Sequence, residues 1–114
     1  MKKNLVIINN EKCTKKEGNF FCENIEVSSI NEILEKKFNI KLILRKSIIN
    51  PVHKINNKNV VISSNIFLFI KNVVNSALRD NARYLIISVT PYTFISFLFL
   101  FLFRRKIFLY LRSD

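Results

Sequence analysis

Polar and charged side chains follow four short apolar runs of this sequence, at the points where a strand would end. Arg45 follows one run, and an arginine fork can bind a carboxylate or a phosphate. Glu11 and Asp114 follow two others, and a carboxylate can accept a proton or a sugar hydroxyl. If the runs are parallel strands, ligands bind at these ends. The candidate substrate-binding residues are therefore Asn9, Asn10, Glu11, Arg45, Thr90, Tyr92, Arg112 and Asp114.

For each of these residues a purely structural role is the alternative, because strand ends are polar in most proteins where the chain reaches the surface. Thr90 illustrates both readings: it can cap a following helix, and the positive end of that helix favours an anion. Arg112 and Asp114 would face a cleft only if the last apolar run is a strand of the same sheet.

No set of residues in the sequence predicts a catalytic mechanism or a metal site. His53 is the single histidine, we place it in a loop, and no orienting partner for it is evident. Cys13 and Cys22 lack the spacing of a zinc knuckle, and we expect two reduced thiols. Gly18 is the only glycine, which excludes glycine-rich phosphate loops. We leave the catalytic residues unassigned and expect no metal and no cofactor in this chain.

Hydrophobic periodicity predicts alternating strands and helices over one domain, residues 1–114. Ser29 and Glu32 fit a capping box, Pro91 suits a helix start, and Glu11–Phe20 and Ser47–Asn59 are polar enough for loops. This order predicts an open, mainly parallel sheet with helices on both faces. The expected strands are Leu5–Ile8, Ile40–Arg45, Val60–Ser63, Tyr84–Val89 and Ile107–Leu111, and the expected helices run from about Ser29 to Phe38, Ile66 to Asp80 and Tyr92 to Arg105.

The formal net charge of +11 indicates attraction to phosphate, although AT-rich codons would also enrich lysine. The basic residues are dispersed, at Lys2-Lys3, Lys15-Lys16, Lys36-Lys37 and Arg104–Lys106. They form no stripe with exposed aromatic residues, so we do not expect nucleic acid as a partner.

Residues 84–103 are apolar and long enough to span a membrane. The alternative function is therefore a small basic membrane-anchored protein without enzyme activity. Thr90-Pro91 interrupts this stretch, which favours a strand followed by a buried helix, and the apolar run near Leu5 is too short for a secretion signal. A binding module of unknown ligand is a third possibility.

The segments "KNLVIINNEK", "ISVTPYTF" and "FLYLRSD" stand in an order that resembles the N-terminal half of bacterial glycosyltransferases of the GT-B fold, family 4-like. The resemblance covers nearly the whole chain. It implies a Rossmann-like domain that binds the acceptor, while a separate C-terminal domain binds the nucleotide-sugar. Asn9-Asn10-Glu11 stands where that family often has a glycine-rich loop, and the donor domain and its paired glutamates are absent.

From this resemblance we expect a truncated or partial glycosyltransferase that is inactive alone. Its partner would be a sugar or lipid-linked acceptor of cell-envelope polysaccharide. We expect a cytoplasmic location with peripheral contact on the inner face of the plasma membrane, and we make no prediction of oligomeric state.

Overall fold

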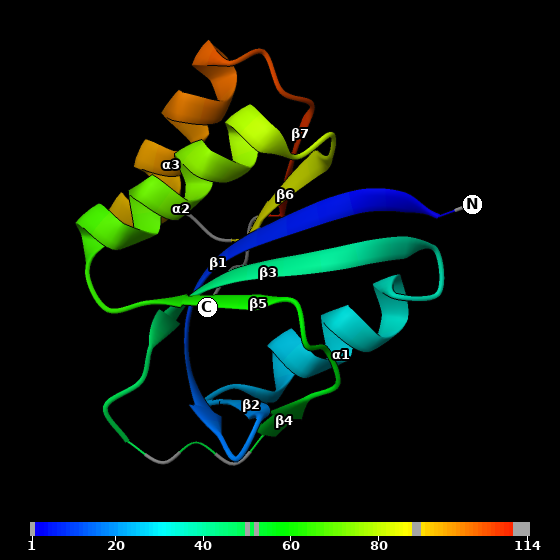
Figure 1. The fold of residues 1–114 in the computed structure, drawn as a ribbon, viewed down its shortest axis with the longest axis vertical. Helices are drawn as coiled ribbons and strands as arrows, with labels where there is room; N and C mark the ends of the chain where they lie inside the picture. The colour runs from blue at the N-terminus through cyan, green and yellow to red at the C-terminus, as the bar shows by residue number, and fades with distance from the viewer. Residues whose placement is uncertain (1, 50, 52, 88–89, 111–114) are drawn as a thin grey trace.

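The computed structural model describes residues 2–49, 51, 53–87 and 90–110 (Figure 1). Within these residues, seven strands form one mixed, open sheet with three helices, which confirms the predicted α/β class. The elements are β1 (Lys3–Lys16), β2 (Asn19–Cys22), α1 (Ile25–Leu34), β3 (Phe38–Lys46), β4 (His53–Ile55), β5 (Val60–Ser63), α2 (Ile66–Arg79), β6 (Arg83–Ile87), α3 (Pro91–Leu102) and β7 (Ile107–Tyr110).

Five of the strands form a parallel array in the order β5-β3-β1-β6-β7. The chain starts at the central strand β1, moves outward on one side through β3 and β5, and then crosses to the other side for β6 and β7. The direction of travel therefore reverses between β1 and β6. In open α/β sheets, this reversal marks the place where ligands bind, at the carboxyl ends of the strands.

β1 is longer than predicted and continues into a hairpin. The strand reaches Lys16, turns through Glu17 and Gly18, and pairs antiparallel with β2, beside which β4 also lies. The turn residues have φ of 53° and 80°, as a type I′ turn requires. The predicted loop at Glu11–Phe20 is therefore wrong, and His53 lies in β4 rather than in a loop. Only one face of this hairpin is buried, and its other face is polar. The average composition of the segment is therefore polar, and the sequence pattern did not predict its two strands.

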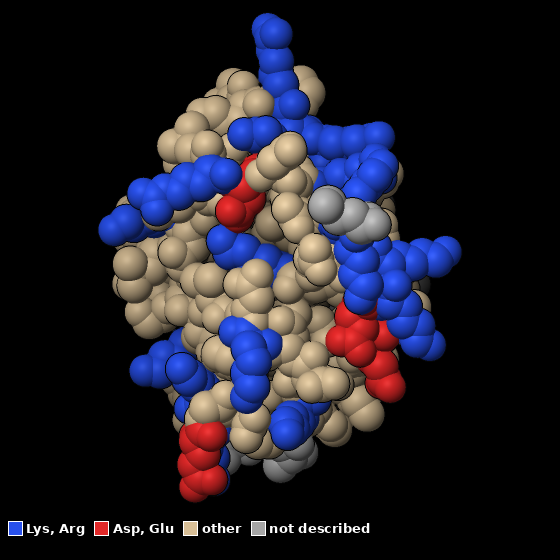
Figure 2. Space-filling model, turned by 45° about the vertical axis from the view of Figure 1, so that its right-hand side comes forward, with Lys and Arg blue, Asp and Glu red and all other residues tan. Residues whose placement is uncertain are grey.

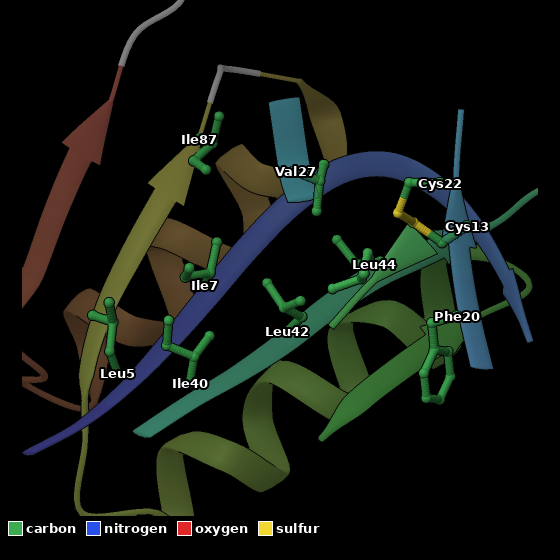
Figure 3. Packing of buried hydrophobic residues seen from close by; sticks show 11 residues of the cluster. Leu5, Ile7, Cys13, Phe20, Cys22, Val27, Ile40, Leu42, Leu44 and Ile87 are labelled. Carbon is green, nitrogen blue, oxygen red and sulfur yellow. A yellow bond between two sulfur atoms is a disulfide. The ribbon is translucent and has the colours of Figure 1, made fainter. Parts of the chain in front are cut away.

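The hairpin carries a disulfide between Cys13 and Cys22, which corrects the expected pair of reduced thiols. The two residues are directly opposite each other in the β1–β2 register, and both are fully buried. Figure 3 shows the bond at one end of the core beside Leu44. Eight residues lie between the two cysteines in the sequence, and the hairpin brings the cysteines together.

Alternate residues of β1 point to opposite faces of the sheet, and both faces are buried. Leu5 and Ile7 pack on the side of α1, together with Leu42 and Leu44 of β3 (Figure 3). Val6 and Ile8 pack on the other side against α2 and α3. Burial on both faces explains the continuous apolar run, as expected for a central parallel strand.

The start of α1 differs from the prediction. Asn24 caps α1 by accepting a hydrogen bond from the Glu26 amide at 2.9 Å, so the expected capping box at Ser29 is wrong. The helix starts earlier because Val27 must face the core. In α2, Asn65 caps the helix by accepting a hydrogen bond from the Leu68 amide at 2.9 Å. The buried face of α2 contains Phe69, Val73 and Ala77.

Residues 84–103 form β6 and α3 instead of one continuous helix, with Ser88 and Val89 outside the described residues. α3 begins at Pro91, with Thr90 as its cap, as the sequence predicts. The part of the chain that the structure describes contains no helix that is long and apolar enough to cross a membrane.

Candidate functional site

A bulge in β1 shapes the carboxyl edge of the sheet, next to the point where the strand order reverses. Ile8 pairs with Ile43 of β3, and the next β1 residue in that ladder is Lys12, which pairs with Arg45. The intervening segment 9–11 therefore faces only Leu44. Bulges redirect side chains and are common beside active sites. This bulge contains the three residues that the sequence places after the first strand.

Asn10, Arg45 and Tyr92, which we call the Arg45 cluster, meet at this edge from β1, β3 and α3. The Arg45 Nη1 donates a hydrogen bond to the Asn10 Oδ1 at 3.2 Å. The Arg45 guanidinium carbon lies 4.0 Å from the centre of the Tyr92 ring, a cation–π contact. All three side chains are partly exposed. The predicted candidates from three separate segments therefore form one cluster.

The Tyr92 ring packs against a side chain of α2. Its centroid lies 5.3 Å from that of Phe69, with the two rings at 88°. Phe69 is fully buried, so this edge-on contact fixes the ring against the core. The sequence gives no signal for this contact, because nothing in the α2 pattern shows that Phe69 lies beside the start of α3.

The amino-terminal end of α3 adds a favourable potential for anions at the same edge. Thr90 and Thr93 form a capping box, in which each hydroxyl accepts a hydrogen bond from the other residue's amide, at 3.3 and 2.8 Å. Ser96 donates to the Tyr92 carbonyl at 2.7 Å. The cap role predicted for Thr90 is confirmed, and the positive end of the helix dipole lies beside Tyr92.

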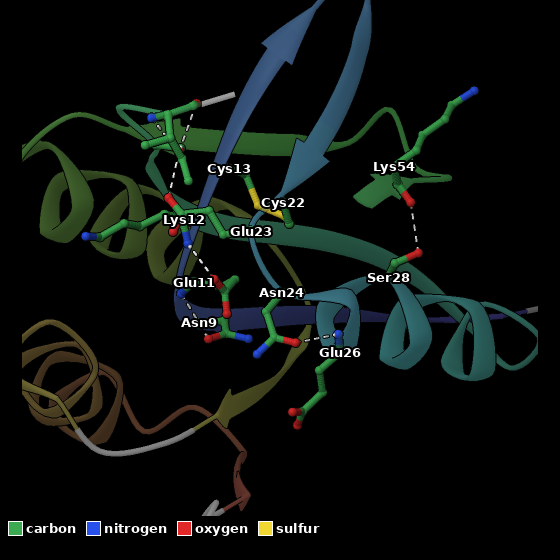
Figure 4. The surroundings of a disulfide bond; sticks show 12 residues. Asn9, Glu11, Lys12, Cys13, Cys22, Glu23, Asn24, Glu26, Ser28 and Lys54 are labelled. Atoms are coloured by element: carbon green, nitrogen blue, oxygen red, sulfur yellow. Dashed lines mark hydrogen bonds between the residues drawn. A yellow bond between two sulfur atoms is a disulfide. The ribbon is translucent and has the colours of Figure 1, made fainter. Parts of the chain in front are cut away.

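Asn9 and Glu11 hold the bulge. The Asn9 Oδ1 accepts from the Glu11 amide at 3.1 Å, and the Glu11 Oε1 accepts from the Lys12 amide at 3.2 Å (Figure 4). Asn9 is only 4% exposed, so it is a positioning residue for Asn10 rather than a ligand contact. Arg112 and Asp114 lie outside the described residues.

The Arg45 cluster combines groups that bind polar and anionic ligands. The guanidinium has five N–H donors, and the amide of Asn10 can both donate and accept. The Tyr92 ring orients the guanidinium through the cation–π contact. Among residues 2–49, 51, 53–87 and 90–110, no group of three His, Cys, Asp or Glu side chains could hold a metal ion.

A second polar network joins α2, β3 and β6 near the opposite edge of the sheet. The Asp80 Oδ2 accepts hydrogen bonds from the Ser76 Oγ at 2.7 Å and the Lys41 Nζ at 3.0 Å. Burial alone would raise the pKa of Asp80, but these bonds outweigh it and hold that pKa below its ordinary value. Burial raises the pKa of the Tyr84 hydroxyl, which lies 3.0 Å from the Ser76 Oγ. The network connects three elements and so stabilises the fold.

Comparison of the chain with protein-family models, curated proteins and solved structures finds no match.

Proposed function

We propose that this chain is a Rossmann-like domain that binds a sugar or lipid-linked acceptor at the Arg45 cluster, as the acceptor-side half of a GT-B glycosyltransferase. The strand order supports the Rossmann-like assignment. Counted along the chain, the parallel strands have the order 3-2-1-4-5, which is that of doubly wound nucleotide-binding folds. The antiparallel strands β2 and β4 join the sheet at the carboxyl-terminal part of the central strand β1.

The observation that carries the proposal is the convergence of Asn10, Arg45 and Tyr92 where the strand order reverses. A lipid-linked acceptor presents a phosphate next to sugar hydroxyls. Arg45 suits the phosphate, Asn10 suits a hydroxyl, and the ring of Tyr92 orients Arg45. The end of α3 favours the same negative charge.

In this proposal the nucleotide-sugar binds to a second domain, so the chain alone binds acceptor but transfers no sugar. It works in peripheral contact with a face of the plasma membrane. Apolar side chains on the outer face of α3 support such a contact: Phe101 is 67% and Leu102 is 72% exposed. Contiguous patches of exposed apolar residues commonly mark a binding surface.

Calorimetric titration with N-acetylglucosamine, galactose and their 1-phosphates tests the proposal. We expect at least one of these probes to bind, and the variant Arg45→Lys to bind it about tenfold more weakly, because a single ammonium group loses the fork that holds a phosphate. Tyr92→Leu should also weaken binding, since it removes the cation–π contact that orients Arg45.

Lys46→Gln is the matched control, because Lys46 is exposed and directly follows Arg45 in β3. Its affinity should stay within about twofold of wild type, as expected for an exposed charge outside the site. Equal weakening by Arg45→Lys and Lys46→Gln would contradict the proposed site. So would the absence of binding by every probe at millimolar concentration.

A further inference from the structure

Cationic side chains lie at the amino ends of three adjacent parallel strands. Lys2 and Lys3 stand at the start of β1, Arg83 opens β6, and residues 104–106 precede β7. Since β1, β6 and β7 are parallel neighbours, their amino ends meet at one edge of the sheet. Figure 2 shows lysine and arginine side chains gathered over this part of the molecule, with few acidic side chains among them.

These residues line one hollow of about 530 Å³, which we call the cationic hollow. Its other lining residues are Asn4, Asn81 and Ala82, so no acidic side chain lines it. Asp80, which precedes Asn81 in the chain, is paired with Lys41. The cations of the hollow are Lys2, Lys3, Arg83, Arg104, Arg105 and Lys106.

Two of these cations are held in place by carbonyl groups at helix ends. Arg105 donates from Nε to the Ala77 carbonyl at 2.8 Å and also from Nη2 to the same oxygen. Lys2 donates to the Glu35 carbonyl at 2.7 Å, at the end of α1. These contacts hold two of the six cations that line the hollow.

The backbone at Arg104 provides a second, independent observation. α3 ends in a Schellman motif, in which the amides of Arg105 and Arg104 donate to the carbonyls of Leu100 and Phe101, both at 3.0 Å. Arg104 occupies the position of this motif that glycine usually takes, and its φ is 58°. A long cationic side chain at a position that favours glycine indicates that the side chain itself is needed there.

We propose that the cationic hollow binds a phosphate-bearing anion, supplied either as a free phosphorylated compound or as a lipid headgroup. Six positive charges around one hollow repel one another, and a phosphate relieves that repulsion. Arginine forks match the oxygen atoms of a phosphate. This site lies at the amino edge of the sheet, opposite the Arg45 cluster, and does not depend on the function proposed for that cluster.

Inorganic pyrophosphate, added at constant ionic strength, is the probe for a free phosphate. We expect it to bind in calorimetric titration and to raise the Tm of the wild-type chain. Arg104→Gly should weaken this binding about fivefold, the effect of losing one close charge. Its Tm without ligand should equal or exceed that of wild type, because glycine suits the backbone conformation at this position. Arg83→Gln provides a second variant.

Lys71→Gln is the control of equal charge, since Lys71 is exposed on α2 and does not line the hollow. This variant should bind pyrophosphate within about twofold of wild type. If Lys71→Gln weakens binding as much as Arg104→Gly and Arg83→Gln do, the attraction is a diffuse effect of net charge and the proposal is overturned.

Vesicles of phosphatidylcholine, with and without phosphatidylglycerol, separate the two sources of phosphate. In one outcome, the chain sediments only with vesicles that contain phosphatidylglycerol, and both pyrophosphate and Arg104→Gly weaken this sedimentation. This result assigns the hollow to a lipid headgroup. Pyrophosphate binding without sedimentation assigns it to a free phosphorylated compound. A chain that binds neither pyrophosphate nor the anionic vesicles overturns the proposal.

Discussion

Asp80 gives a prediction at the scale of a single residue. Its pKa is lower in the folded chain than the ordinary value, because Ser76 and Lys41 donate to the carboxylate and outweigh the effect of burial. A lowered aspartate pKa contributes stability above the ordinary pKa of 3.8, and that contribution is lost as the pH falls through the folded value. Acid should therefore destabilise the wild-type chain partly through Asp80.

The free energy of unfolding, measured by urea at about pH 5 and about pH 3, should fall less in Asp80→Asn than in wild type. The side chain is about one-third exposed, so solvent screening limits the difference to under about 1 kcal/mol. Glu32→Gln, on the exposed face of α1, should retain the wild-type pH dependence. An Asp80→Asn variant with an unchanged pH dependence would show that the carboxylate does not contribute in this way.

The residues of the Arg45 cluster were predictable, and the roles of their neighbours were not. Asn10, Arg45 and Tyr92 meet because the carboxyl ends of parallel strands share an edge, which follows from the alternation of strands and helices. Nothing in the order Asn9-Asn10-Glu11 shows that a bulge turns only the middle residue toward Arg45. That distinction depends on the register between β1 and β3.

At the scale of an element, the hairpin of β1 and β2 depends on its disulfide. Closing a loop between cysteines nine residues apart stabilises the folded chain by roughly 2–3 kcal/mol in the chain-entropy model. We therefore expect reduction with dithiothreitol to lower the free energy of unfolding by about this amount. Thiol titration of chain purified without reductant and then denatured should find no free thiol, because both cysteines are paired.

Cys13→Ser is the control, because its remaining cysteine has no partner in the chain and dithiothreitol should not change its stability. Two results together would contradict the disulfide. They are two titratable thiols in the chain purified without reductant and a free energy of unfolding that dithiothreitol does not change.

The element boundaries show where the sequence patterns were informative. β5 has the predicted bounds, and α3 begins next to the predicted residue, because Thr90-Pro91 is a strong local signal. The hairpin was missed because Glu11, Lys12, Lys15, Lys16 and Glu17 give this segment the average composition of a loop. α1 was placed too late because Ser29 and Glu32 imitate a cap, whereas Val27 requires an earlier start.

At the scale of the whole molecule, the parallel array separates two binding surfaces. The Arg45 cluster lies at the carboxyl edge of the sheet, and the cationic hollow lies at the amino edge. In the sequence, Lys2-Lys3 and Arg104–Lys106 are about as far apart as the chain allows, so the charge seemed dispersed. Their meeting follows only from the pairing of β1 with β6 and of β6 with β7, which hydrophobic patterns do not specify.

The most direct test of the proposed function is to locate an acceptor-like ligand on the folded chain. Two-dimensional NMR of the ¹⁵N-labelled protein, titrated with N-acetylglucosamine 1-phosphate and galactose 1-phosphate, would do this. We predict that the amide signals of Asn10, Arg45 and Tyr92 shift for at least one probe, and that Arg45→Lys raises the probe concentration needed for these shifts about tenfold. Signals that shift only at Lys3, Arg83 and Lys106, or that do not shift at all, would contradict the proposed acceptor site.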